Sequence, residues 1–318
     1  MTPPRSGYHQ TTSCRIIAVG GAKGGIGKSI LAANLGVYLA RKGFRTVLVD
    51  LDLGAANLHL YMGVWGLKHR IDDYLDKQSE CLDAIAVETD HGPLLIGGGS
   101  GRLGSANLPF TRKLKLMRAI RKLDADVAVL DLGASTHYNI LDFFLLADTQ
   151  LVMTTCDPAA YLDAYTFVKM ALYRRLARLF GSESKYRKFK DEALQEVIQS
   201  FVAPDRRHLP DKVCDLMNRI QARFPRHHYL VADALHHFQP KLVVNLADIQ
   251  EEVRQVVTRL QKVADRMLST RIQLAGTIFS DRNIARSTRD LKPEVDRHPN
   301  GLLARAIGQI VRQARVAS

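Results

Sequence analysis

Short apolar runs alternate with longer amphipathic stretches along most of the chain. The runs are rich in β-branched residues or leucine and are mostly bounded by Gly, Asp or Pro, as strands are: 16–19, 46–50, 94–96, 127–131, 150–154, 242–245 and 273–278. Between them, apolar residues recur at helical spacing near 30–42, 111–123, 138–146, 158–179, 248–268 and 301–315. Because buried strands separated by helices form parallel sheets, the pattern predicts an α/β fold with a mostly parallel, twisted sheet flanked by helices on both faces.

Two segments depart from this alternation. Residues 1–13 are polar and contain two prolines, so we expect a flexible N-terminus. Residues 170–230 are rich in lysine and arginine and show successive helical patterns without a convincing strand. We therefore expect a single domain over 14–318 that carries a basic helical insertion at about 170–230.

The composition, with 46% hydrophobic residues in 318, is enough for a sizeable core. No run approaches the roughly 18 apolar residues of a membrane span, and the N-terminus lacks the apolar segment of a secretory signal. Cys14, Cys81, Cys156 and Cys214 lie far apart and form no C-x-x-C pair. They indicate reduced thiols of a cytoplasmic protein, and they argue against a protein that carries a metal cluster.

The net charge of the chain is strongly positive, since 45 lysines and arginines against 32 acidic residues give +13. Such a charge favours association with polyanions such as DNA or an anionic membrane surface. A solvated basic surface without either partner is an equally open interpretation.

The most informative motif is residues 21–29, which read Gly-Ala-Lys-Gly-Gly-Ile-Gly-Lys-Ser between a predicted strand and a predicted helix. A glycine-rich turn in that position presents backbone N–H groups and a helix N-terminus to an anion. Lys28 can reach the β- and γ-phosphates of a nucleotide, and Ser29 offers a hydroxyl to Mg²⁺. The motif therefore predicts nucleotide binding.

An additional lysine, Lys23, narrows the class. With it the loop fits K-G-G-x-G-K-[ST] and resembles the deviant phosphate-loop ATPases of the ParA/MinD family. The resemblance implies a P-loop NTPase fold of the SIMIBI type, ATP and Mg²⁺ as cofactors, and hydrolysis of ATP to ADP and phosphate. It also implies that Lys23 acts across an ATP-dependent homodimer on the partner's nucleotide. The implied nucleotide contacts are Gly24, Gly25, Ile26, Gly27, Lys28, Ser29 and Ile30.

Aspartates follow two of the predicted strands. Asp50, Asp52, Gly54 and Asn57 fit the family's first switch segment, D-x-D-x-G-x-x-N, in which Asp52 would orient the attacking water beside the metal. Capping of a following helix is the alternative for these aspartates, more so for Asp50 than for Asp52.

A second strand ends in Asp131-Leu-Gly133, like the family's second switch. The resemblance implies that Asp131 holds a Mg²⁺-bound water and that Gly133 lets the loop respond to the γ-phosphate. The chain departs from the usual Gly-Ala-Gly at Gly133-Ala134-Ser135, and a purely structural Asp131 is the alternative.

Three further segments border the expected site. Asn245 resembles the family's strand-end asparagine that bonds the adenine edge, for which an amide is suited as donor and acceptor. The segment 154–158, Thr-Thr-Cys-Asp-Pro, resembles the family's loop at the dimer interface. Residues 97–101, Gly-Gly-Gly-Ser-Gly, predict a mobile loop near the active-site edge.

Within the family, the stretches 54–59 and 162–165 most resemble the FlhG/FleN branch, the flagellar-number regulators close to MinD. That resemblance implies a dimerising ATP switch that acts on a regulatory protein partner at the flagellum, cell pole or division site. A partition ATPase that coats DNA as an ATP dimer is the alternative, and a metabolic enzyme such as an ATP-dependent ligase is a third.

The last predicted helix raises the question of a membrane. Leu302, Leu303, Ile307, Ile310 and Val311 form one apolar stripe, and arginines occupy other positions. A basic amphipathic helix can lie on an anionic membrane. Because it follows the last strand at the spacing of a closing core helix, we expect it to pack on the core, with peripheral attachment of the protein at membrane or nucleoid as the alternative.

Overall fold

An eight-stranded sheet organises the computed structural model, which describes residues 14–99, 108–203 and 212–314. The predicted flexibility of residues 1–13 lies outside the described residues. The strand order is β3-β4-β2-β5-β1-β6-β7-β8. The strands are β1 (Arg15–Gly20), β2 (Thr46–Asp50), β3 (Val87–Glu88), β4 (Leu94–Ile96), β5 (Val127–Asp131), β6 (Thr149–Thr154), β7 (Lys241–Ala247) and β8 (Gln273–Phe279). All pairings are parallel except that of the edge strand β3 with β4, so the predicted α/β class is confirmed.

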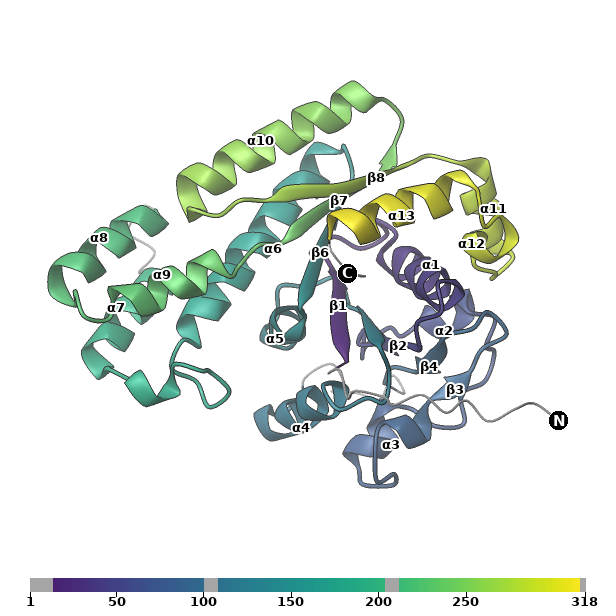
Figure 1. Cartoon of the computed structure of the whole chain (residues 1–318), viewed down its shortest axis with the longest axis horizontal. Coiled ribbons are helices and arrows are strands. Elements are labelled where there is room, and N and C mark those ends of the chain that lie inside the picture. The colour runs from purple at the N-terminus through teal and green to yellow at the C-terminus, as the bar shows by residue number, and fades with distance from the viewer. Residues whose placement is uncertain (1–13, 100–107, 204–211, 315–318) are drawn as a thin grey trace.

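Helices cover both faces of the sheet because alternate strand residues point to opposite sides. On one face Ile17 and Val19 pack with α1 (Lys28–Arg41), α2 (Leu58–Tyr61), α12 (Glu294–Arg297) and α13 (Leu302–Gln313). On the other face Ile16 and Ala18 belong to a core shared with α3 (Ile71–Leu75), α4 (Phe110–Ile120), α5 (Tyr138–Leu146), α6 (Pro158–Ala177) and α10 (Gln250–Leu268). Figure 1 shows the two layers, with α1 and α13 on one side of the central strands and α4 and α5 on the other.

The basic segment forms α7 (Glu192–Val202), α8 (Val213–Arg223) and α9 (His228–His236), which gather at one end of the molecule beside α6 (Figure 1). Short 3₁₀ turns, Asp83–Ile85 and Arg187–Phe189, and the helix α11 (Arg282–Arg289) complete the list. The predicted boundaries of the insertion, 170 and 230, fall inside α6 and α9. Arg174 and Arg175 therefore belong to a core helix of the sheet, although their charge resembles that of the segment that follows.

The last helix packs on the core, as predicted. Leu303, Ile307 and Ile310 on α13 are buried against β8 and α1. A Cβ on Gly276 of β8 would lie 2.6 Å from Ile310 Cγ1, so strand and helix are in close contact. Leu302 is 53% exposed, and its assignment to the same stripe was wrong. Among the described residues, no helix combines the length and the apolar character that a membrane crossing requires.

Candidate nucleotide-binding site

The glycine-rich loop lies between β1 and α1, at the carboxyl edge of the parallel strands, where sheets of this kind bind ligands. Gly27 precedes the first residue of α1 with φ of 90°, in the left-handed region that glycine adopts without strain. A Cβ there would also lie 2.4 Å from the side-chain nitrogen of Asn245. This position therefore requires glycine for two independent reasons.

Lys28 is the first residue of α1, and its side chain is buried within the loop. Its ammonium donates to the Lys23 carbonyl oxygen at 3.0 Å. Burial lowers the pKa of Lys28, and the nearby charges of Asp131 and Asp52 oppose that shift. The loop thus holds a cation at the helix N-terminus, where the helix dipole also favours an anion, beside two carboxylates.

Asp131 lies at the end of β5, in register with Val19 of β1 and Asp50 of β2. It is almost fully buried, and its Oδ1 has no hydrogen-bond partner among the described residues. Burial and the neighbouring Asp50 raise the pKa of Asp131 well above its usual range, opposed by a hydrogen bond from the Ser29 side chain and by Lys28. A buried carboxylate oxygen left without a donor, beside a hydroxyl, is a donor set that suits Mg²⁺ or a water bound to it.

Asp50 has a structural role. Its Oδ2 accepts a hydrogen bond from the backbone N–H of Leu58 at 3.0 Å, and its Oδ1 accepts one from that of Asp52 at 3.1 Å. Burial raises the pKa of Asp50 to about 7. The carboxyl therefore caps the start of α2 and shapes the segment that follows β2, which is the alternative that the sequence left open for it.

Asp52 is half-buried and faces the second switch segment. Its Oδ1 accepts from the backbone N–H of Ala55 at 3.2 Å. A Cβ on Gly133 would lie 3.0 Å from the same oxygen, so the two predicted switch segments touch at this point. The charges of Asp52 and Asp131 both act on the Lys28 ammonium, so the structure brings these three side chains into one site.

Lys23 contacts the chain's own surface. Its ammonium lies 2.9 Å from Asp157 Oδ2, and the two side chains are 33% and 53% exposed. Asp157 belongs to the segment 154–158 and precedes α6, so this segment binds Lys23 within the same chain.

Asn245 lies inside β7, two residues before its end, and not at a strand end as predicted. The ladder to β8 is interrupted after Val244, and Leu246 takes the left-handed conformation with φ of 52°. The Asn245 side-chain nitrogen donates to the Ile26 carbonyl oxygen at 2.8 Å. This contact joins β7 to the glycine-rich loop.

A cavity of ≈ 650 Å³ opens beside Asn245. Its walls include Gly25, Gly27, Ile30, Asn245, Leu246, Ile278, Phe279, Arg282, Ile284 and Thr288. It begins at the phosphate loop and is mostly apolar beyond it, as expected of a pocket that holds a planar base.

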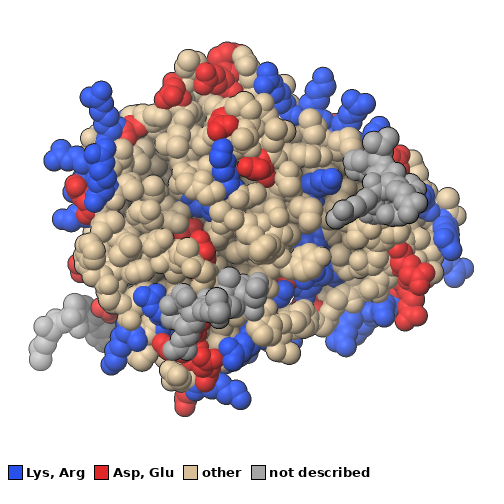
Figure 2. Space-filling model, turned by 180° about the vertical axis from the view of Figure 1, so that it is seen from behind, with Lys and Arg blue, Asp and Glu red and all other residues tan. Residues whose placement is uncertain are grey.

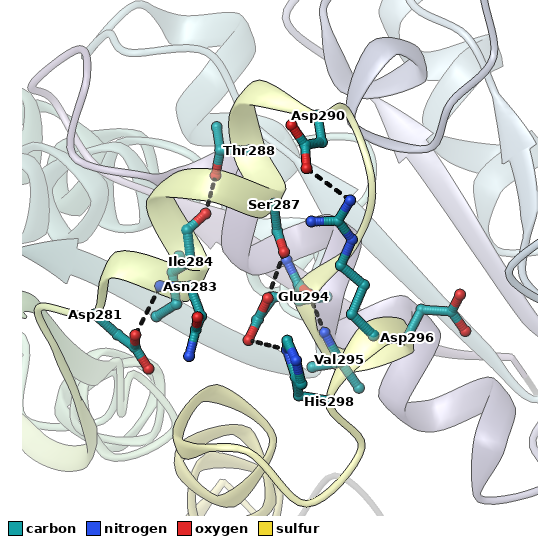
Figure 3. Close-up of polar contacts among 12 residues, drawn as sticks. Asp281, Asn283, Ile284, Ser287, Thr288, Asp290, Glu294, Val295, Asp296 and His298 are labelled. Atoms are coloured by element: carbon teal, nitrogen blue, oxygen red, sulfur yellow. Dashed lines mark hydrogen bonds and ion pairs between the residues drawn. The ribbon is translucent and has the colours of Figure 1, made fainter.

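The far wall of this cavity is α11, which the sequence did not predict. Buried Ser287 on α11 donates a hydrogen bond to Glu294 on α12, and the other carboxylate oxygen lies 2.8 Å from His298 Nδ1 (Figure 3). The backbone N–H of Val295 donates to Asn34 Oδ1 on α1 at 2.9 Å. The wall is thereby fixed to the helix that follows the phosphate loop. A local signal existed in Asp281-Arg-Asn, because Asp281 caps α11.

The glycines after β4 are packed, and their predicted mobility was wrong for the described ones. Gly97, Gly98 and Gly99 are buried, and a Cβ on Gly98 would lie 2.6 Å from Ala56 Cβ. They let the first switch segment approach β4 closely. The remaining residues of that run lie outside the described part of the chain.

The chain resembles known proteins over most of its length. Residues 17–318 match the family described as CobQ/CobB/MinD/ParA nucleotide binding domain. The flagellum site-determining protein YlxH of Helicobacter pylori is 31% identical over 178 residues, which are 52% of this chain and 57% of that protein. The antiactivator FleN of Pseudomonas aeruginosa is 29% identical over 58% of this chain and 72% of its own length. The match to YlxH thus spans little more than half of that relative.

The fold is shared with a solved structure at much lower sequence identity. The cell division ATPase MinD of Pyrococcus furiosus superposes with a TM-score of 0.61 at 17% identity, covering 95% of this chain and 99% of that one. At this identity the likeness establishes the fold. With the family match, the phosphate loop and the two carboxylates around Lys28, the conclusion is that the chain belongs to the CobQ/CobB/MinD/ParA family of nucleotide-binding domains.

Proposed function

We propose that the protein is a Mg²⁺-dependent ATPase of the MinD/ParA type that works as a nucleotide-controlled switch. The observation that carries this is the unpaired Oδ1 of buried Asp131, beside the Ser29 hydroxyl and the Lys28 ammonium. Ser29 and Asp131, with Asp52 nearby, would hold the Mg²⁺, which neutralises phosphate charge when bound. Backbone N–H groups of residues 24–30 would bind the phosphates.

The chain's own residues account for the chemistry of hydrolysis. Asp52 is half-buried and next to Gly133, so it can orient a water toward the γ-phosphate while the second switch segment responds to it. Lys28 stabilises the charge that develops on the phosphate oxygens. Asn245 would bind the adenine edge within the cavity of ≈ 650 Å³.

The bound nucleotide would control whether the switch contacts another protein. Lys23 lies at the rim of the site, where an ATP-bound homodimer would let it reach the partner's nucleotide. The names of the relatives, a flagellum site-determining protein and an antiactivator, support a role in setting the place or number of a cellular structure through a regulatory protein partner.

DNA binding by an ATP dimer is the second candidate, and the charge of +13 supports it. Figure 2 shows lysines and arginines grouped around the rim of one face, whereas the middle of that face is largely uncharged. Acidic residues lie among the basic ones on this face, which supports the regulatory switch over a DNA-coating dimer for that face.

Light scattering of the purified chain tests both candidates. With Mg-ATP we expect the mass of a dimer, with ADP that of a monomer, and for Lys28→Ala the mass of a monomer with either nucleotide. Calorimetry with Mg-ATP measures nucleotide binding by the two chains directly. Light scattering with duplex DNA or anionic vesicles separates the candidates, because only a partition ATPase would bind DNA with steep salt dependence and only in ATP. Absence of any Mg-dependent ATP binding by the wild-type chain would overturn the proposal.

A further inference from the structure

A second cavity, of ≈ 420 Å³, lies at the C-terminal ends of α4, α5 and α6. Leucine and methionine side chains form much of its lining, and α9 and the segment after α6 complete it. Because α5 follows β5 and α6 follows β6, both helices begin at the nucleotide edge of the sheet and end at the opposite edge. The cavity is therefore separate from the nucleotide site and shares no lining residue with it.

Four basic side chains line this cavity: Arg121, Arg175, Arg178 and Lys185. A volume of this size suits a small molecule more than a protein segment. The charges around the cavity indicate the charge of the small molecule that it could bind.

One carboxylate in the wall is shared by three cations. Asp142 is 1% exposed. Its Oδ1 lies 2.8 Å from Arg174 Nε and 2.9 Å from Arg178 Nη1, and its Oδ2 pairs with the ammonium of Lys113. Burial alone would raise the pKa of Asp142, but the hydrogen bonds of Arg174 and Lys113 and the charge of Arg178 hold it below its usual value. Asp142 is thus ionised, and the cluster still carries an excess of two positive charges.

Arg175 has no carboxylate of its own in the described part of the chain. Its Nε donates to the Ala234 carbonyl oxygen at 2.8 Å, and its half-buried guanidinium forms no ion pair with a carboxylate of the described residues. Asp233, whose charge acts on Arg175, is bonded to Lys185 at 2.7 Å and to the Tyr186 hydroxyl. Burial lowers the pKa of Arg175, as expected of a cation that lacks a counter-ion.

Arg121 adds a further positive charge at the cavity. It ends α4 at the rim of the cavity, is exposed, and makes no ion pair within residues 14–99, 108–203 and 212–314. The carboxylate of Glu183 also lines the cavity, but it is paired with Arg118 at 2.6 Å. Two guanidinium groups therefore border the cavity without an ion-pair partner among the described residues. A planar guanidinium binds phosphate or carboxylate oxygens through two parallel hydrogen bonds.

We propose that this cavity is a second ligand site, which binds a small anion with phosphate or carboxylate oxygens through Arg121 and Arg175. The ligand's charge would offset the cationic excess around Asp142, and its body would lie on the leucine and methionine side chains. This inference does not rest on the nucleotide chemistry of the first site.

Calorimetry with inorganic pyrophosphate tests the site. The full chain carrying Lys28→Ala is used, so that the phosphate loop does not compete for the probe. We expect one pyrophosphate bound per chain. Adding Arg121→Ala and Arg175→Gln to this variant should weaken the affinity by at least about tenfold, since two charge-assisted contacts are lost.

The matched control is Lys28→Ala with Arg254→Ala, because Arg254 on α10 is 71% exposed and does not line the cavity. This control should bind pyrophosphate as Lys28→Ala does. A titration with citrate then distinguishes the two ligand chemistries, since tighter binding of citrate identifies a carboxylate ligand and tighter binding of pyrophosphate a phosphate ligand.

Folding of every variant is checked by thermal unfolding. Should Arg175→Gln unfold the chain, Arg121→Ala alone is measured, for which we expect at least a threefold loss. No uptake of either anion by Lys28→Ala would overturn the proposal, and so would equal affinities of the cavity variant and the Arg254 control.

Discussion

The Lys23 ammonium lies 2.9 Å from Asp157 Oδ2, across 134 residues of sequence. The other oxygen of Asp157 accepts from the backbone N–H of Ala159 at 2.7 Å and caps α6. One carboxylate therefore both starts α6 and holds the rim lysine within its own chain. The hydrogen bond from Lys23 is the main reason that the pKa of Asp157 is lowered. Lys23 must leave this ion pair before it can reach a second subunit, and because both side chains are partly exposed the pair costs little to break.

Asp157→Asn should promote self-association in ATP. The amide keeps an oxygen to cap α6 but loses the charge that holds Lys23. We expect dimers at several-fold lower protein concentration, measured by light scattering in Mg-ATP. Asp163→Asn, a charge-matched change within α6, should leave association unchanged. Equal or weaker association of Asp157→Asn would show that the pair does not compete with dimerisation.

Asp52→Ala should slow hydrolysis and preserve binding. Loss of a group that positions the attacking water costs about 10²–10⁴-fold in rate, whereas Lys28 and the loop N–H groups that bind phosphate remain. Single-turnover hydrolysis and nucleotide titration measure the two effects separately. Asp50→Asn is a useful comparison, because Asp50 caps α2 and should affect stability more than rate. If Asp52→Ala hydrolyses ATP at the normal rate, a residue other than Asp52 positions the attacking water.

Gly27→Ala should abolish nucleotide binding and destabilise the fold. Its φ of 90° costs a non-glycine residue about 1–3 kcal/mol, and the new Cβ would collide with the Asn245 side chain at 2.4 Å. The matched control is Gly43→Ala, which has a φ of 91° but no atom within 4 Å of its Cβ. Urea denaturation should show the backbone cost in both variants and the additional loss only at Gly27. Equal losses in the two would mean that the loop moves away from Asn245 easily.

Asp142→Asn should destabilise the protein by about 3 kcal/mol at neutral pH, because three cations are left around a neutral side chain. The folded pKa of Asp142 is lowered, so its contribution to stability is fully present above the ordinary value of 3.8 and is lost as the pH falls through the folded value. The difference between wild type and variant should therefore shrink below about pH 4. Urea denaturation at several pH values measures it, with exposed Asp265→Asn as control. A difference that stays constant down to pH 2 would contradict the assignment.

Local sequence was sufficient for the sheet and for the phosphate loop. Alternation of buried strands and helices is a short-range property, and the backbone of residues 21–29 is determined by its glycines and by the helix that follows. The strand-end position of Asp131 followed in the same way, because the carboxyl ends of parallel strands meet at one edge. The two-residue β3 and the short helices α2, α3 and α12 have too few residues for a period to show.

The local hydrophobic pattern did not predict the position of Asn245 within its strand. Its residue type and the end of the apolar run indicated a strand terminus, but β7 continues through an irregularity at Leu246. That irregularity depends on the register with β8, which no short segment encodes. The burial of Gly97–Gly99 likewise depends on Leu53 and Ala56, which approach from another strand end.

The sequence by itself determined that this chain binds a nucleotide at the end of a parallel sheet, because the residues that do so are consecutive or end adjacent strands. Only the tertiary structure decided that Lys23 is held by Asp157, that α11 forms a wall of the nucleotide cavity, and that Arg121 and Arg175 border one cavity. Each of these contacts joins residues that are far apart in the chain. Packing and electrostatic interactions depend on the distance between groups in space, and a local hydrophobic pattern does not contain that distance.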